Sequence, residues 1–182
     1  DFRWSVQQAV MATEDSYYRM DTMRGAQTRE HLPSYKLERL TFDVPRRSDL
    51  PAGEQGLSEA LAVAQGVSLA KDLGNLPGNI CTPTYLAETA KKMAAASGGS
   101  LKVKVLEEAD MEKLGMGSLL SVSKGSRQPA KLICFEYLNG PKGEKPVALV
   151  GKGLTFDAGG ISIKPGAKME DMKFLQIKPW LE

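Results

Sequence analysis

The sequence has few of the side chains on which many catalytic and metal sites depend. It contains one histidine and two cysteines among 182 residues. Cys81 and Cys134 lie far apart and form no Cys-x-x-Cys pair, so neither a disulfide framework nor a cysteine zinc site is expected. This cysteine usage favours the reducing cytoplasm. A Ser-His-Asp triad could use only His31, which lies in a polar segment and is better interpreted as a solvated surface residue.

Long apolar runs and a strong charge of one sign are also missing. No apolar run reaches the roughly 18 residues that a membrane-spanning helix needs, so no such helix is expected. The 24 basic and 22 acidic residues give a net charge of +2, which offers no electrostatic reason for nucleic acid as the main partner. The apolar share of 42% excludes wholesale disorder. The chain opens with Asp1 rather than Met, so we expect upstream residues, and any targeting signal among them, to be missing.

Hydrophobic periodicity predicts alternating helices and strands. Helices are predicted over residues 1–24, 54–73, 82–97 and 107–114, with a loop over 25–36. Strands are predicted over residues 36–44, 101–105, 131–138 and 147–150, and residues 118–123 form a short strand or an irregular segment. The last strand is an unbroken apolar run, as expected for a central parallel strand covered on both faces. This alternation predicts an α/β fold with a largely parallel or mixed sheet.

Two of the helices carry boundary signals. Thr82 and Pro83 suit the N-cap and the first helical position, and Gly74 is a candidate C-cap for the preceding helix. The first helix has two interpretations. It either packs against the core that follows or connects two domains, the first of which is absent.

A glycine-rich segment follows the predicted strand 147–150. The carboxyl ends of strands are where ligands bind in open α/β sheets, and the glycines allow a ligand to approach the backbone. Lys152, Asp157 and Lys164 converge on this stretch. It is not a phosphate-binding P-loop, because Pro146 and Gly153 occupy positions that need glycine and a hydroxyl residue. From the residues alone, a loop stabilised by Lys–Asp ion pairs is favoured over a ligand site, because such surface pairs are common.

Motifs in this segment resemble a known family. Val150–Lys164 contains Gly-Lys-Gly-Leu-Thr-Phe-Asp-Ala-Gly-Gly and is followed by Met169-Glu-Asp-Met-Lys. Both stretches closely resemble the leucine aminopeptidase family of two-metal exopeptidases, in particular its bacterial aminopeptidase A members. Asp72–Pro83 resembles the start of the family's catalytic domain, and the first helix resembles the linker helix that precedes it. The similarity extends to about Phe174.

The resemblance implies a domain division and a fold. Residues 1–35 would be an interdomain linker helix and loop, and residues 36–174 would be the N-terminal part of the catalytic domain. That domain is a three-layer α/β structure with a mixed sheet, of the zinc-exopeptidase type. The intact protein would assemble as a homohexamer.

The resemblance also implies the roles of four residues. Lys152, through its neutral amine, and Asp157, as a bridging carboxylate, would bind two divalent ions, zinc or manganese. Lys164 would stay protonated and polarise the scissile carbonyl. Met172 would line the pocket for the first side chain of the peptide substrate. The implied activity is release of amino-terminal residues from peptides, with a preference for large apolar side chains.

The end of the chain departs from the family pattern. Leu175 occupies the position of a family metal-binding aspartate, and residues 175–182 form a tail unlike the family. The later Asn-Thr-Asp-Ala-Glu-Gly-Arg motif, with further carboxylate ligands, does not occur in the sequence. We therefore expect this chain to be a catalytically incomplete fragment. Two alternatives are a DNA-binding architectural role, known in some bacterial members, and a truncated product without a function of its own.

Overall fold

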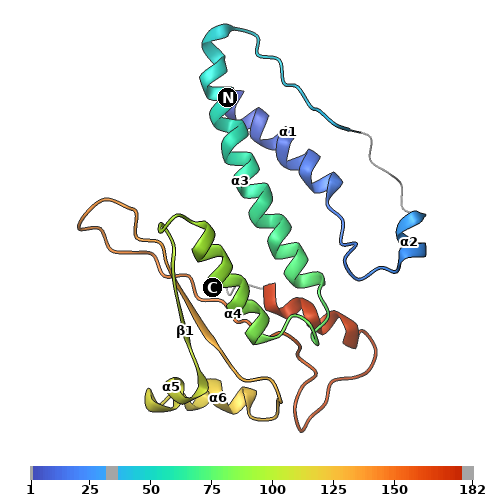
Figure 1. Cartoon of the computed structure of the whole chain (residues 1–182), viewed down its shortest axis with the longest axis vertical. Coiled ribbons are helices and arrows are strands. Elements are labelled where there is room, and N and C mark those ends of the chain that lie inside the picture. Colours follow the sequence, from blue (N-terminus) through green and yellow to red (C-terminus); the bar gives the residue numbers. More distant parts are fainter. Residues whose placement is uncertain (1, 32–36, 178–182) are drawn as a thin grey trace. The chain divides into compact units, whose positions relative to one another are not determined.

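The computed structural model describes residues 2–31 and 37–177, and the chain forms two compact units, residues 1–75 and 76–182 (Figure 1). The predicted domain boundaries at 35 and 174 concern the intact protein and stay predictions. Of the predicted non-family tail, residues 178–182 lie outside the described residues. Among the helices of the described ranges, none is long and apolar enough to cross a bilayer.

Two helices that pack along each other form the first unit. They are α1 (Phe2–Tyr17) and α3 (Leu50–Asn75), and the core between them contains Val6, Val10 and Ala60. Small residues spaced three or four apart lie on one face of α3, where the two helices approach closely: Gly53, Gly56, Ala60 and Ala64 are buried. A Cβ atom on Gly56 would collide with the backbone of Arg3, so the close approach of α1 requires glycine there.

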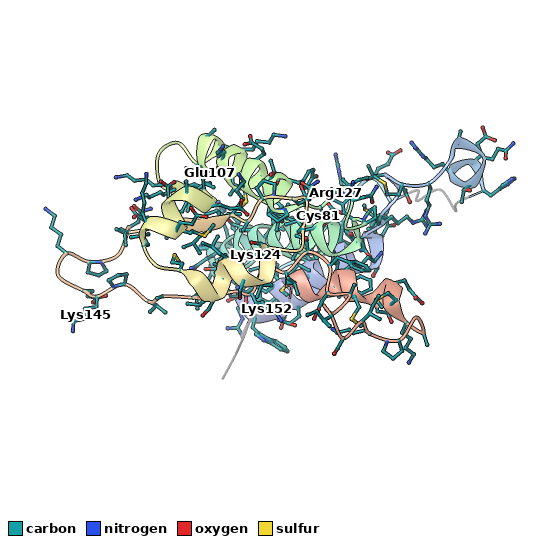
Figure 2. The ribbon with its side chains drawn as sticks, turned by 90° about the horizontal axis from the view of Figure 1, so that it is seen from below. Cys81, Glu107, Lys124, Arg127, Lys145 and Lys152 are labelled. Atoms are coloured by element: carbon teal, nitrogen blue, oxygen red, sulfur yellow. The ribbon has the colours of Figure 1, made fainter. Side chains whose placement is uncertain are left out.

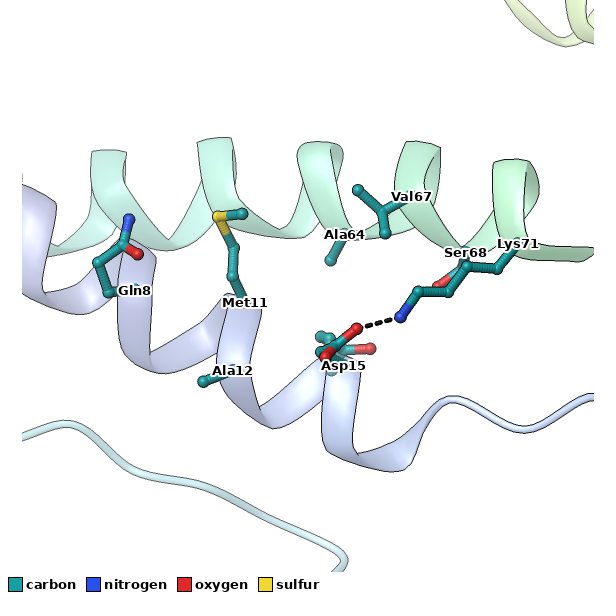
Figure 3. A pocket seen from close by; sticks show the side chains of 9 residues that line it. Gln8, Met11, Ala12, Asp15, Ala64, Val67, Ser68 and Lys71 are labelled. Atoms are coloured by element: carbon teal, nitrogen blue, oxygen red, sulfur yellow. Dashed lines mark hydrogen bonds and ion pairs between the residues drawn. The ribbon is translucent and has the colours of Figure 1, made fainter. Parts of the chain in front are cut away.

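Polar contacts border this apolar seam. Figure 3 shows Met11 extending from α1 toward α3, and beside it the ion pair between Lys71 and Asp15. Arg3 forms a second ion pair, with Glu59, and its guanidinium lowers the pKa of that carboxyl. These pairs are partly exposed, so solvent screens them and each contributes little to stability. The buried seam is therefore the main source of stability in this unit.

Several predictions for the first unit need correction. The first helix ends at Tyr17 rather than near residue 24, and a short helix α2 (Ala26–Glu30) occupies part of the predicted loop. The strand predicted over 36–44 is wrong for its described residues, 37–44, which form no strand. Of its apolar side chains, Phe42 packs against the core of α1 and α3, whereas Leu37 and Leu40 are exposed. Gly74 is not a C-cap, since it is buried inside α3.

The second unit contains helices and a small sheet. Its elements in order are α4 (Pro83–Ala96), β1 (Lys102–Leu106), α5 (Glu108–Lys113), α6 (Gly117–Ser123), β2 (Leu132–Glu136) and the 3-10 helix η2 (Met169–Ile177). β1 and β2 pair antiparallel, with Lys102 opposite Glu136 and Leu106 opposite Leu132. Fully buried Met111 and Cys81 belong to the core of this unit, together with Ala87 and Ala90 of α4.

The α/β class is confirmed, but one central strand of the prediction does not form. Residues 147–150 have no strand structure, and Val147 and Leu149 are 86% and 90% exposed. A strand needs a neighbour to pair with its backbone groups, and the sheet of the described residues consists of β1 and β2 alone. Residues 118–123 belong to helix α6 rather than to a strand or an irregular segment.

The predicted N-cap of α4 is confirmed, and it gives a testable stability effect. The Thr82 hydroxyl accepts a hydrogen bond from the backbone N–H of Tyr85 at 3.2 Å. Replacing this acceptor by Thr82→Ala is expected to lower the free energy of unfolding by about 1 kcal/mol, measured by urea denaturation. Thr89→Ala is the matched control, because the Thr89 hydroxyl donates to a carbonyl inside the same helix. An equal loss in both variants would contradict the capping role.

Candidate active site

The glycine-rich segment folds back on itself in a tight hairpin over residues 158–164. Gly159 and Ile163 form an antiparallel bridge, and the Lys164 N–H donates to the Ala158 carbonyl at 2.9 Å. Gly159 has a φ of 90°, a conformation that side chains disfavour, and a Cβ there would collide with the backbone of Ser162. The hairpin therefore depends on this glycine, and it brings residues 157 and 164 side by side.

Asp157 and Lys164 form an ion pair across the base of the hairpin. The Lys164 ammonium donates to Asp157 Oδ2 at 2.7 Å, and the Gly159 N–H donates to Oδ1 at 3.3 Å. The hydrogen bond from Lys164 is the main reason why the pKa of the Asp157 carboxyl is lowered, so the carboxylate form is favoured. The two side chains are 24% and 38% exposed, so the pair is open to a ligand.

Met172 joins this pair from a different element. It lies in η2, which follows the hairpin, and its sulfur is 3.4 Å from the Lys164 ammonium. Three of the four residues singled out in the sequence are thus in contact. A thioether beside a cation also provides an apolar surface next to a charged group.

Lys152, the fourth residue, contributes through its charge. It lies on an exposed stretch before the hairpin (Figure 2), and its positive charge helps to lower the pKa of Asp157. That effect is smaller than the effect of Lys164, which donates a hydrogen bond directly. Asp157 is therefore in contact with Lys164 and within electrostatic range of Lys152.

One contact at the site was not found from the sequence. A Cβ atom placed on Gly78 would lie 3.1 Å from Cβ of Phe156, so the Phe156 side chain packs directly over this glycine. The sequence did show that residues 75–79 are rich in turn-forming residues and that Phe156 precedes Asp157. Neither pattern, however, indicates that segments separated by more than seventy positions meet.

The donor set fits part of a metal centre. An aspartate oxygen and a lysine amine are both possible ligands, and the carboxylate is partly exposed. Within residues 2–31 and 37–177, no group of three or more histidine, cysteine, aspartate or glutamate side chains could hold an ion. Two divalent ions need several anionic oxygens, so Lys152 and Asp157 by themselves would make up only a portion of a dinuclear site.

Comparison with known proteins decides the family. The family model described as "Cytosol aminopeptidase family, catalytic domain" matches residues 68–175. This chain belongs to the cytosol aminopeptidase family. The match includes α4, both strands, the hairpin and the first part of η2. The family inferred from the motifs around Asp157 is therefore confirmed.

Curated relatives of the family are similar over nearly the whole chain. A probable cytosol aminopeptidase of Thioalkalivibrio sulfidiphilus is 55% identical over 174 residues, which are 96% of this chain and 34% of the relative. One from Nitrosococcus oceani is 54% identical over 165 residues, covering 91% of this chain and 32% of that protein. The chain thus spans about a third of the length of the relatives it matches.

Solved structures of the same fold are also similar. The bottromycin maturation enzyme BotP in complex with Mn matches with a TM-score of 0.69 and 29% identity, covering 95% of this chain and 32% of that one. A second BotP structure gives a TM-score of 0.67 and 30% identity. The manganese belongs to the BotP complex. The roles of Lys152, Asp157, Lys164 and Met172 in the present chain stay predictions.

Proposed function

We propose that this chain carries one part of the active site of a metal-dependent aminopeptidase that removes amino-terminal residues from peptides. The observation that carries the proposal is the contact of Asp157, Lys164 and Met172 in a segment that belongs to the cytosol aminopeptidase family. A carboxylate, a cation and an apolar surface are the groups needed to bind a metal, polarise a carbonyl and receive a side chain.

Each residue has a distinct part in this proposal. Asp157 and Lys152 would hold divalent ions, manganese or zinc, which when bound supply an activated water. Lys164 would place its positive charge where the carbonyl oxygen gains negative charge. Met172 would contact the first side chain of the peptide and favour large apolar ones. Hexamer formation, a DNA-binding role and a cytoplasmic location stay predictions.

We further propose that the 182-residue chain alone does not hydrolyse peptides. Leu175 stands where the family pattern has a metal-binding aspartate, and an alkyl side chain cannot coordinate a metal. One carboxylate and one amine leave the charge of two divalent ions largely uncompensated. The proposal thus separates the function of the intact enzyme from the capability of this polypeptide.

A chimaera tests both statements. Residues 1–174 replace the matched third of the Thioalkalivibrio sulfidiphilus relative, and the chimaera and the 182-residue chain are assayed with Mn²⁺ and leucine p-nitroanilide. We expect turnover by the chimaera and none by the chain above a metal-only blank. Turnover by the chain would refute its inactivity. A folded, metal-loaded chimaera without activity, beside an active relative, would count against the proposed function.

A further inference from the structure

The loop that carries Asp157 has few apolar contacts of its own. Val150 before it and Ile161 and Ile163 in the hairpin are 75% or more exposed. Among the described residues the loop contains no strand, and its backbone pairing consists of isolated bridges, at Gly151 and between Gly159 and Ile163. Its position relative to the rest of the second unit must therefore come from particular contacts.

Phe156 supplies such a contact. Its side chain lies over Gly78, with Cβ at 3.1 Å and Cδ2 at 3.4 Å from the point that a Cβ on Gly78 would occupy. The 3.1 Å distance is tighter than most Cβ contacts, so Phe156 occupies the space that a side chain on Gly78 would need. Phe156 directly precedes Asp157 in the chain. A contact that fixes the Phe156 side chain therefore also restricts the position of the Asp157 carboxylate.

The turn that contains Gly78 is itself well fixed. The Ile80 and Cys81 N–H groups both donate to the Pro77 carbonyl, at 2.9 Å and 3.0 Å. Leu76 and Cys81, on either side of the turn, are 5% and 0% exposed. Thr82 then caps α4, so the turn is continuous with a packed helix.

From these contacts we propose that the Pro77–Thr82 turn is a platform for Phe156 and that Gly78 and Phe156 are positioning residues for Asp157. The inference rests on the proposed function, because it assigns a purpose to the placement of the metal-binding carboxylate. A Cβ at Gly78 requires Phe156 to shift by a few tenths of an ångström, and we expect that shift to loosen the start of the hairpin. The platform keeps Asp157 beside Lys164 without a regular strand.

Amide hydrogen exchange of the full chain measures this placement. The Lys164 N–H, bonded to the Ala158 carbonyl, reports on the hairpin, and the paired amides of β1 and β2 report on the rest of the unit. We expect Gly78→Ala to speed exchange at Lys164 about tenfold, as overpacking by one methyl group does, and to leave the strands unchanged. Gly166→Ala is the matched control, because a Cβ at Gly166 meets nothing within 4 Å.

A second variant separates positioning from a general loss of stability. Phe156→Ala removes the ring that lies over Gly78 without adding an atom to the turn. We expect it also to speed exchange at Lys164 and to leave the paired amides of β1 and β2 unchanged. Unchanged exchange at Lys164 in both Gly78→Ala and Phe156→Ala would overturn the inference.

Mn²⁺ as a probe distinguishes this inference from the proposed function. Paramagnetic broadening of the Gly159 amide signal shows whether manganese reaches Asp157, since that amide donates to the carboxylate. We expect broadening in the unsubstituted chain, and in Gly78→Ala at a several-fold higher Mn²⁺ concentration. No broadening in the unsubstituted chain would count against Asp157 as a ligand and so against the proposed function. The exchange data would still decide whether the platform positions the loop.

Discussion

Asp157→Asn is expected to lower kcat/KM of the chimaera by at least about a thousandfold, because an amide cannot replace a charged ligand between two cations. The substitution retains the size and shape of the side chain. Its partly exposed ion pair with Lys164 contributes at most about 1 kcal/mol, so the chimaera should remain folded. Leucine p-nitroanilide hydrolysis and metal content by mass spectrometry measure the two effects, and we expect both activity and bound metal to fall.

Asp43→Asn is the matched control for this variant. Asp43 is an exposed carboxylate in the first unit, and its replacement removes the same charge from a residue that is not part of the hairpin. We expect activity and metal content to stay unchanged. If Asp157→Asn retained the activity and the full metal content, Asp157 would not be a ligand, and the ion pair would be a structural feature of the loop.

Lys164→Gln is expected to lower kcat by roughly a hundredfold to a thousandfold, the usual effect of removing one charged donor from a carbonyl-polarising site. The Lys164 ammonium is held at 2.7 Å from Asp157 and 3.4 Å from the Met172 sulfur, so its position is defined by both neighbours. Because Lys164 is proposed to contact substrate rather than metal, the metal content should not change. This separates its role from that of Asp157 in the same assay.

Lys145→Gln controls for the loss of a positive charge. Lys145 lies exposed at the far end of an extended loop (Figure 2). Its replacement should leave kcat unchanged. If Lys164→Gln lost metal together with activity, Lys164 would act on the centre through Asp157 rather than on the carbonyl. Full activity in Lys164→Gln would remove it from the mechanism.

Local signals in the sequence predicted α1, α3, α4, α5 and the two strands that form, but not α2 or α6. The helical periodicity of apolar residues over 54–73 identified α3, and the Thr82–Pro83 pair identified the start of α4. Both signals are local, because helix periodicity and capping depend on neighbouring residues. The strands over 36–44 and 147–150 were predicted from equally apolar patterns, and their described residues, 37–44 and 147–150, form no strand. Strand formation depends on a partner elsewhere in the chain, and that information is not local.

At the candidate site, too, local features could be predicted from the sequence and long-range contacts could not. The family and the four candidate residues were inferred from the motifs around Asp157. This was possible because the positions of glycines and of chemically active side chains can be read from the sequence without knowing the fold. Which of the four touch, and at what distance, depended on the fold.

The sequence by itself determined the family, the α/β class and the identity of Lys152, Asp157, Lys164 and Met172 as the residues of interest. The tertiary structure decided that Asp157, Lys164 and Met172 meet, and that Phe156 rests on Gly78. The physical reason is range. Capping, periodicity and glycine conformations depend on residues a few positions apart. Packing brings together segments that are distant along the chain, and the sequence of neither segment indicates which other segment it will contact.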